Sequence, residues 1–180
     1  QLRDRVIVIT GGTSGIGAAT ALALAREGAC PVMMGLDALP LQLSDDLQQA
    51  GVRFSHHTVD LRDHERVATI IDSIVTEYGR IDGLVNNAGV NDRVGLSAGP
   101  AAFSASLERN LVHYYTMAHF IVPHLIKTQG AIVNVASKTA LTGQGDTSGY
   151  CAAKGGQLAL TREWAISLAA HNIRVNAVLP

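Results

Sequence analysis

The chain has 180 residues, a formal net charge of −1 and 47% hydrophobic residues. This length suits one domain, or most of one, with a sizeable core. The nearly neutral charge argues against a nucleic-acid groove or an acidic membrane surface as a partner. No apolar run reaches membrane-spanning length, and the first residues show no signal-peptide pattern. Cys30 and Cys151 match no pairing motif, so we expect free thiols and a cytoplasmic location.

Short apolar runs alternate with longer segments of helical periodicity along the chain. In chain order, we expect a strand at 5–10, a helix from the next glycines to about 27, a strand at 30–35, a helix at 39–50, a strand at 53–59, a helix at 63–78, a strand at 83–87, a long helix at 101–126, a strand at 131–136, a helix at 150–171 and a strand at 174–179. This alternation predicts a single α/β domain. Its doubly wound parallel sheet lies between two helical layers, with right-handed crossovers giving the strand order 3-2-1-4-5-6.

A glycine-rich turn separates the first expected strand from the first expected helix. Glycines permit a tight turn and close approach of a pyrophosphate, which then faces the N–H groups of the helix N-terminus. A merely structural glycine turn is the alternative, but the strand before it and the helix after it favour a dinucleotide site. The candidate cofactor residues of this turn are Gly11, Thr13, Ser14, Gly15, Ile16 and Gly17.

The ends of the second and third strands should face the adenosine part of such a cofactor. Asp37 is the candidate ligand of the ribose hydroxyls, and no arginine or lysine stands beside it to bind a 2′-phosphate. We therefore expect NAD or NADP, with a lean towards NAD. Asp60, followed by Leu61, could accept a hydrogen bond from an adenine amine, or it could cap the next helix.

A further stretch, from Ser137 to Lys154, carries the candidate catalytic groups. Tyr150 and Lys154 are four residues apart and share one face of a helix. An ammonium about 5 Å from a phenol favours the phenolate by at most about 3 kcal/mol, which makes the tyrosine usable as an acid or base near neutral pH. Ser137 could donate a hydrogen bond to the reacting oxygen. Tyr-x-x-x-Lys alone is a weak pattern, because it is common by chance.

Five motifs in order make the chain resemble the short-chain dehydrogenase/reductase family: TGGTSGIG, NNAG at 86–89, Asn110, Ser137 and YCAAK. The resemblance implies that Tyr150 transfers a proton, that Lys154 assists it and holds the nicotinamide ribose, and that Ser137 positions the substrate oxygen. It further implies a water relay at Asn110. The cofactor contacts that it adds are Asn87, Ala88, Gly89 and Pro180. The family's last strand and substrate-covering segment would follow Pro180, so the domain looks truncated after strand six. Relatives of this kind are usually tetramers or dimers.

Within that family, the runs GVNDRVGL, SLERNLVHYY and LTREWA resemble the L-fucose dehydrogenase group. This implies oxidation of L-fucose or a related sugar at the anomeric carbon to the lactone. A polar pocket suits such a polyhydroxylated ligand, because unpaired buried polar groups would penalise an acyl chain. Solvated loop positions are the alternative for each residue. The candidate substrate residues are Asn91, Asp92, Lys138, Gln144 and Asp146, with Arg93, Thr139 and Thr147 beside them.

Other functions and other ligands remain open at this point. Within enzymes, the chain could reduce a 3-oxoacyl thioester or a generic ketone. Outside enzymes, it could be a non-catalytic regulator that binds a dinucleotide. His113, His119 and His124 are spaced by six and five residues, which do not share a helical face. We therefore expect no metal site, and surface or interface positions for these three histidines.

Overall fold

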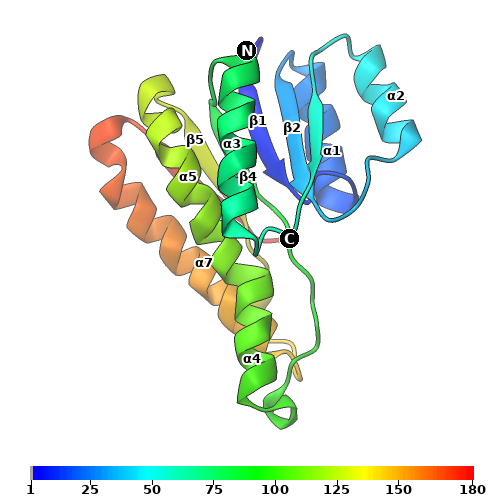
Figure 1. The fold of residues 1–180 in the computed structure, drawn as a ribbon. Helices are drawn as coiled ribbons and strands as arrows, with labels where there is room; N and C mark the ends of the chain where they lie inside the picture. Colours follow the sequence, from blue (N-terminus) through cyan, green and yellow to red (C-terminus); the bar gives the residue numbers. More distant parts are fainter. Residues whose placement is uncertain (1) are drawn as a thin grey trace.

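The computed structural model describes residues 2–180, which form one six-stranded, fully parallel sheet (Figure 1). The strand order β3-β2-β1-β4-β5-β6 confirms the predicted topology. The strands are β1 (Val6–Thr10), β2 (Cys30–Gly35), β3 (Ser55–Thr58), β4 (Gly83–Asn86), β5 (Ala131–Val135) and β6 (Arg174–Val178). Because every connection crosses over in parallel, the carboxyl ends of all six strands lie along one edge.

Helices cover both faces of this sheet. The main helices are α1 (Gly15–Arg26), α2 (Leu41–Gln49), α3 (His64–Tyr78), α4 (Pro100–Leu107), α5 (His113–Thr128) and α7 (Ser148–Ser167). One apolar cluster lies under α3 and α5, and a second lies under α1 and α2. Within residues 2–180, no helix combines the length and the hydropathy that crossing a bilayer would require.

The local sequence explains why β1 is a strand and α3 a helix. All five residues of β1, VIVIT, are buried, as expected for a central parallel strand covered on both faces. In α3, Val67, Ile71 and Ile74 recur at helical spacing and point into the core. Asp63 caps its first turn by accepting a hydrogen bond from the Arg66 N–H, and Gly79 ends it in the left-handed conformation.

The expected single helix at 101–126 is wrong in one respect. A π-helical segment, η2 (Glu108–Val112), separates α4 from α5. Such turns contain one extra residue and often mark functional sites, but hydrophobic periodicity does not reveal them. Two shorter helices were also not predicted: η1 (Leu96–Ala98) and α6 (Thr139–Thr142). The helix expected at 150–171 ends as a separate 3₁₀ turn, η3 (Ala169–His171). Figure 1 shows α4 beyond the carboxyl ends of the strands, where the expected site lies.

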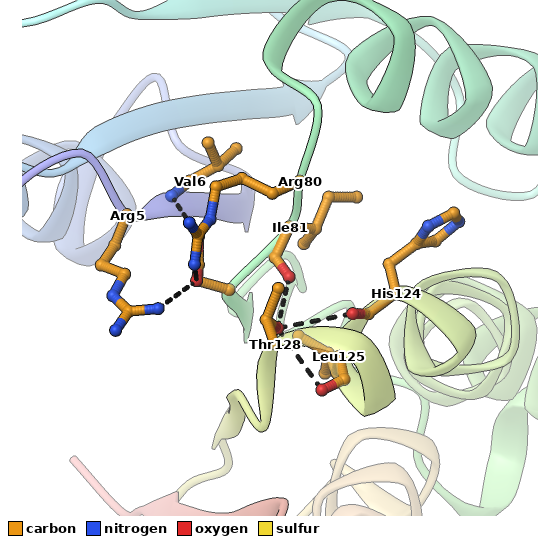
Figure 2. A network of polar contacts seen from close by, with 8 residues as sticks. Arg5, Val6, Arg80, Ile81, His124, Leu125 and Thr128 are labelled. Carbon is orange, nitrogen blue, oxygen red and sulfur yellow. Dashed lines mark hydrogen bonds and ion pairs between the residues drawn. The ribbon is translucent and has the colours of Figure 1, made fainter.

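A buried carboxylate lies at the amino ends of the strands, opposite the expected site. Asp82, whose side chain is 4% exposed, accepts hydrogen bonds from Arg5 at 2.7 Å, from Arg80 at 2.8 Å and from the Val6 N–H at 3.0 Å (Figure 2). Nearby, the Thr128 hydroxyl donates to the Ile81 carbonyl at 2.8 Å and joins α5 to the start of β4. Burial would raise the pKa of Asp82, but the hydrogen bonds from Arg80, Arg5 and Val6 outweigh it and lower that pKa.

Asp82→Asn should reduce the free energy of unfolding by about 2–4 kcal/mol at pH 7, because two guanidinium groups lose their counter-charge. The Asp82 contribution is present above the unfolded-state pKa of about 3.9 and is lost as the pH falls through the lower folded-state pKa. The difference between the variant and the wild type should therefore shrink below about pH 4. Urea unfolding at pH 7 and pH 3 measures this. Asp45→Asn, at an exposed position of α2, is the control; equal stability of Asp82→Asn and wild type at pH 7 would contradict the prediction.

Candidate active site

A cleft of about 510 Å³ lies at the carboxyl ends of the central strands. The loops after β1, β2, β3 and β4 form one side, and the starts of α5 and α7 with the π segment form the other. Predicted cofactor and catalytic residues line it together: Gly11, Ser14, Gly15, Ile16, Asp37, Asp60, Leu61, Asn87, Ala88, Gly89, Tyr150 and Lys154. Three of the predicted cofactor residues do not line the cleft: Thr13 and Gly17, which are buried, and Pro180.

The glycine turn is braced by the loop after β4. Gly11 has a φ of +62°, and a Cβ there would come within 3.0 Å of the Ala88 Cα. The Asn87 amide donates to the carbonyls of Thr10 and Gly11 at 3.0 and 3.1 Å. The Thr10 hydroxyl in turn accepts from the backbone N–H groups of Asn87 and Ala88. These bonds fix the turn whose glycines leave room for a phosphate beside the start of α1.

The adenosine end of the cleft holds an ion pair that the sequence did not predict. Asp60 accepts three side-chain hydrogen bonds from Arg62, the shortest at 2.6 Å. These bonds lower the pKa of Asp60 to about 2. The alternative that Asp60 caps α3 is wrong, because Asp63 performs that role. Asp37 is exposed and lines the cleft, and its backbone carbonyl accepts a hydrogen bond from the His56 Nε2 at 3.0 Å.

Lys154 and Tyr150 lie together on α7, as their spacing predicted. The Lys154 Nζ is 5.4 Å from the Tyr150 ring centroid and donates to the Val135 carbonyl at 2.7 Å. The Tyr114 hydroxyl donates to the same carbonyl at 3.0 Å. Lys154 is 3% exposed, and burial lowers its pKa to about 8, so it still carries its charge at pH 7. The ammonium is therefore fixed beside the phenol by the end of β5.

Asn110 lies in the π segment and joins three parts of the site. Its side-chain Oδ1 accepts from the Val90 N–H at 2.7 Å, which holds the loop that leaves β4. Its backbone carbonyl accepts from the Gln157 amide on α7, also at 2.7 Å. Both side chains are fully buried. Sequence reasoning missed Gln157, although its position three residues after Lys154 places it on the same face of α7.

Ser137 lies two residues beyond β5 and is half-buried, outside the residues that line the cleft. Its Oγ accepts from the Thr139 N–H at 3.3 Å, at the start of α6. Pro180 is tied to the same loop, because its carbonyl accepts from the Lys138 N–H at 3.1 Å. The loop after β5 and the end of β6 are thus held together.

A second cavity, of about 380 Å³, gathers some of the predicted substrate residues. Asn91, Gln144 and Asp146 line it, and the Asn91 amide donates to the Gln144 side chain at 3.1 Å across two loops. Asp92 does not line it. The Asp92 carboxylate instead accepts from Ser106 at 3.0 Å and from Arg109 at 3.1 Å. The exposed Lys138 also lies outside the cavity.

The surface or interface position expected for His113 is wrong. His113 is 2% exposed and lines the cleft, because the π segment turns this face of α5 towards it. His119 is exposed as expected, and the expectation for His124 is met only in part, since it is half-buried. Among residues 2–180, no three histidine, cysteine or acidic side chains converge as metal ligands would.

Comparison with known proteins identifies the family. Residues 5–180 match the family model described as short chain dehydrogenase. The chain is a short-chain dehydrogenase/reductase. It is 34% identical over 183 residues to the 3-oxoacyl-acyl-carrier-protein reductase of Thermotoga maritima, covering 100% of this chain and 74% of that protein. It is 33% identical over 183 residues to the L-fucose dehydrogenase of Mus musculus, covering 98% of this chain and 64% of that protein.

The solved structure of NAD+-bound xylitol dehydrogenase superposes with a TM-score of 0.93 at 31% identity, covering 100% of this chain and 71% of that one. Other structures similar to this dehydrogenase/reductase hold NAD or NADP. The chain is therefore an NAD(P)-dependent oxidoreductase that acts on an alcohol or ketone. Its cleft fits such a cofactor, because Gly15 lines it and a Cβ there would project into open space that the glycine leaves free.

Lys154→Met should raise the free energy of unfolding at pH 7 by about 2 kcal/mol. A pKa lowered to about 8 means that burying the charged Lys154 destabilises the folded wild type by about 3 kcal/mol at pH 7. The variant avoids this cost but loses the hydrogen bond to Val135, which is worth about 1 kcal/mol. Between pH 8 and about 10.4 the folded wild type binds fewer protons than the unfolded chain. The free energy of unfolding of the wild type therefore rises, relative to that of the variant, as the pH increases through this window. The advantage of the variant should shrink or reverse at pH 10.

Urea unfolding at pH 7 and pH 10 measures this difference. Lys127→Met, at an exposed position of α5, is the matched control and should change neither value. A Lys154→Met variant that is less stable than the wild type at pH 7, or whose advantage is the same at both pH values, would refute this account of the buried ammonium.

Proposed function

We propose that the chain oxidises a hydroxyl group of a polyhydroxylated small molecule, with L-fucose or a related pyranose oxidised at the anomeric carbon to the lactone. The observation that carries this proposal is the polar lining of the second cavity. Apart from Gly145, every residue that lines it has a polar or charged side chain: Asn91, Arg93, Gln144, Asp146 and Thr147. A sugar can form hydrogen bonds with these groups, whereas an acyl chain would displace the water around them without replacing its hydrogen bonds.

The loop after β4 contributes consecutive residues to the two cavities. Val90 lines the cofactor cleft, and Asn91, the next residue, lines the second cavity. On the other side, Thr147 lines the second cavity and Tyr150 lines the cleft, three residues later on the same chain segment. In this proposal, a sugar in the second cavity presents a hydroxyl towards Tyr150.

In this proposal, Tyr150 accepts the proton of the substrate hydroxyl while Ser137 steadies the same oxygen with a hydrogen bond. Lys154 places its positive charge 5.4 Å from the centre of the Tyr150 ring. Asn110, in the π segment, fixes the loop after β4 beside them. A nicotinamide ring held in the cleft would supply the acceptor for the hydride of the reacting carbon. The alcohol would thus lose a hydride from carbon and a proton from oxygen, the proton to Tyr150, and become a carbonyl.

The cofactor preference that we propose is NAD. Asp37 lines the cleft at the end of β2, where a carboxylate binds ribose hydroxyls and repels a 2′-phosphate. Arg62 also lines the cleft, but its guanidinium is already paired with Asp60. A 2′-phosphate could pair with the Arg62 guanidinium only by displacing the carboxylate of Asp60.

A relative named L-fucose dehydrogenase agrees with this substrate class, but identity alone does not decide it, because the Thermotoga reductase of 3-oxoacyl thioesters is equally similar. The polar second cavity is what favours a sugar. The reduction of a 3-oxoacyl thioester is therefore the second candidate, and the same assay tests both.

Initial rates with L-fucose, D-arabinose, L-galactose, simple alcohols and acetoacetyl thioesters should separate these candidates. We expect the highest kcat/KM with L-fucose or a close stereochemical relative, and higher values with NAD than with NADP. Cofactor absorbance at 340 nm follows the reaction in both directions. Reduction of acetoacetyl thioesters without turnover of any sugar would overturn the substrate proposal, and a strong NADP preference would overturn the role given to Asp37.

Tyr150→Phe should lower kcat by more than about 100-fold, because the ring remains but the proton acceptor is removed. The affinity for NADH, measured by its fluorescence, should change by less than about threefold. Tyr115→Phe is the matched control, since this tyrosine of α5 is 57% exposed. Turnover of Tyr150→Phe within a few-fold of the wild type would defeat the proposed proton transfer.

A further inference from the structure

His113 is a polar side chain that the site described above does not use. It lies in the wall of the cofactor cleft and is 2% exposed. Within residues 2–180, neither of its ring nitrogens has a hydrogen-bond partner. The Arg109 carbonyl, one turn earlier, favours a protonated ring, but its geometry falls short of a hydrogen bond. A buried polar group without a partner destabilises the protein, so a molecule in the cleft that pairs this ring would gain affinity.

His113 lines the same cleft as Asp60, at the expected adenosine end, and Lys154, at the expected nicotinamide end. The charges of Lys154 and Asp60 both act on its ring. Burial lowers the pKa of His113 to about 4, which leaves the ring neutral at pH 7. A neutral imidazole offers one N–H donor and one acceptor nitrogen. Ribose hydroxyls and phosphate oxygens, which lie between the two bases of a dinucleotide, can use these groups.

We propose that His113 is a cofactor-binding residue whose ring forms a hydrogen bond, directly or through one water, with the ribose–phosphate part of the dinucleotide. This inference rests on the proposed position of the dinucleotide in the cleft. A neutral ring contributes a hydrogen bond and no charge, so its effect on affinity should not depend on salt. One such bond is worth about 0.5–1.5 kcal/mol, which is about a 2- to 10-fold change in affinity.

A different role for His113 is packing within the protein. Its ring lies 5.0 Å from that of Tyr114, with the two planes tilted by 55°. A residue that only packs would change the stability of the protein without the cofactor and leave the affinity for cofactor fragments unchanged. The two roles therefore differ in a measurable way.

The test is calorimetric titration of the intact protein with ADP-ribose, which carries the ribose–phosphate part but no nicotinamide. His113→Phe should bind it about 2- to 10-fold more weakly, at 20 mM and at 200 mM salt alike. His113→Gln, which keeps a neutral donor and acceptor, should recover most of this loss. His119→Phe, at an exposed position of the same helix, should bind as the wild type does.

Wild-type affinity in His113→Phe, or a loss that disappears at 200 mM salt, would overturn the proposal. Failure of the wild type itself to bind ADP-ribose would instead overturn the proposed cofactor site. A measurement on the wild type avoids any folding defect of the variants: the imidazole ¹⁵N resonances of His113 should shift when ADP-ribose is added. Unchanged His113 resonances at saturating ADP-ribose would also overturn the proposal.

Discussion

The carbonyl of Val135 is the acceptor on which the arrangement of the site depends. It ends β5 and receives hydrogen bonds from the ammonium of Lys154 at 2.7 Å and from the hydroxyl of Tyr114 at 3.0 Å. A buried ammonium without such a partner would cost several kcal/mol. The bond therefore keeps a charged group inside the fold and at a fixed distance from Tyr150. It also ties α7 and α5 to the same strand end, so that the helices cannot shift independently of the sheet.

The π segment between α4 and α5 connects the loop after β4 to helix α7. It places Asn110 where the side chain holds the loop after β4 and the carbonyl meets Gln157 of α7. The same local change of helical pitch brings His113 to the cleft wall. A regular helix over this stretch would present a different set of residues to the cleft. One extra residue in a helical turn thus determines which side chains can meet a cofactor.

The sequence predicted what repeats along the chain, and it missed what depends on one position. Buried β-branched runs such as VIVIT, and the glycines that end the segments, predicted the strands. The alternation of strands with helices predicted their order. The spacing of Tyr150 and Lys154 correctly placed the phenol and the ammonium together. The π segment was not predictable, because its residues fit helical periodicity as well as their neighbours do. His113 was accordingly expected at a surface or interface. The ion pair between Asp60 and Arg62 was missed for a different reason, because it depends on one side chain two residues away in a loop.

The central claim is that the Tyr150–Lys154 pair of α7 faces a dinucleotide bound along the carboxyl ends of the strands. A crystal structure of the intact protein with NAD tests it most directly. The account predicts the pyrophosphate against the glycine turn at Gly11, and the nicotinamide ribose within hydrogen-bond distance of the Lys154 Nζ. A dinucleotide bound elsewhere, or a nicotinamide ribose that does not touch Lys154, would contradict it.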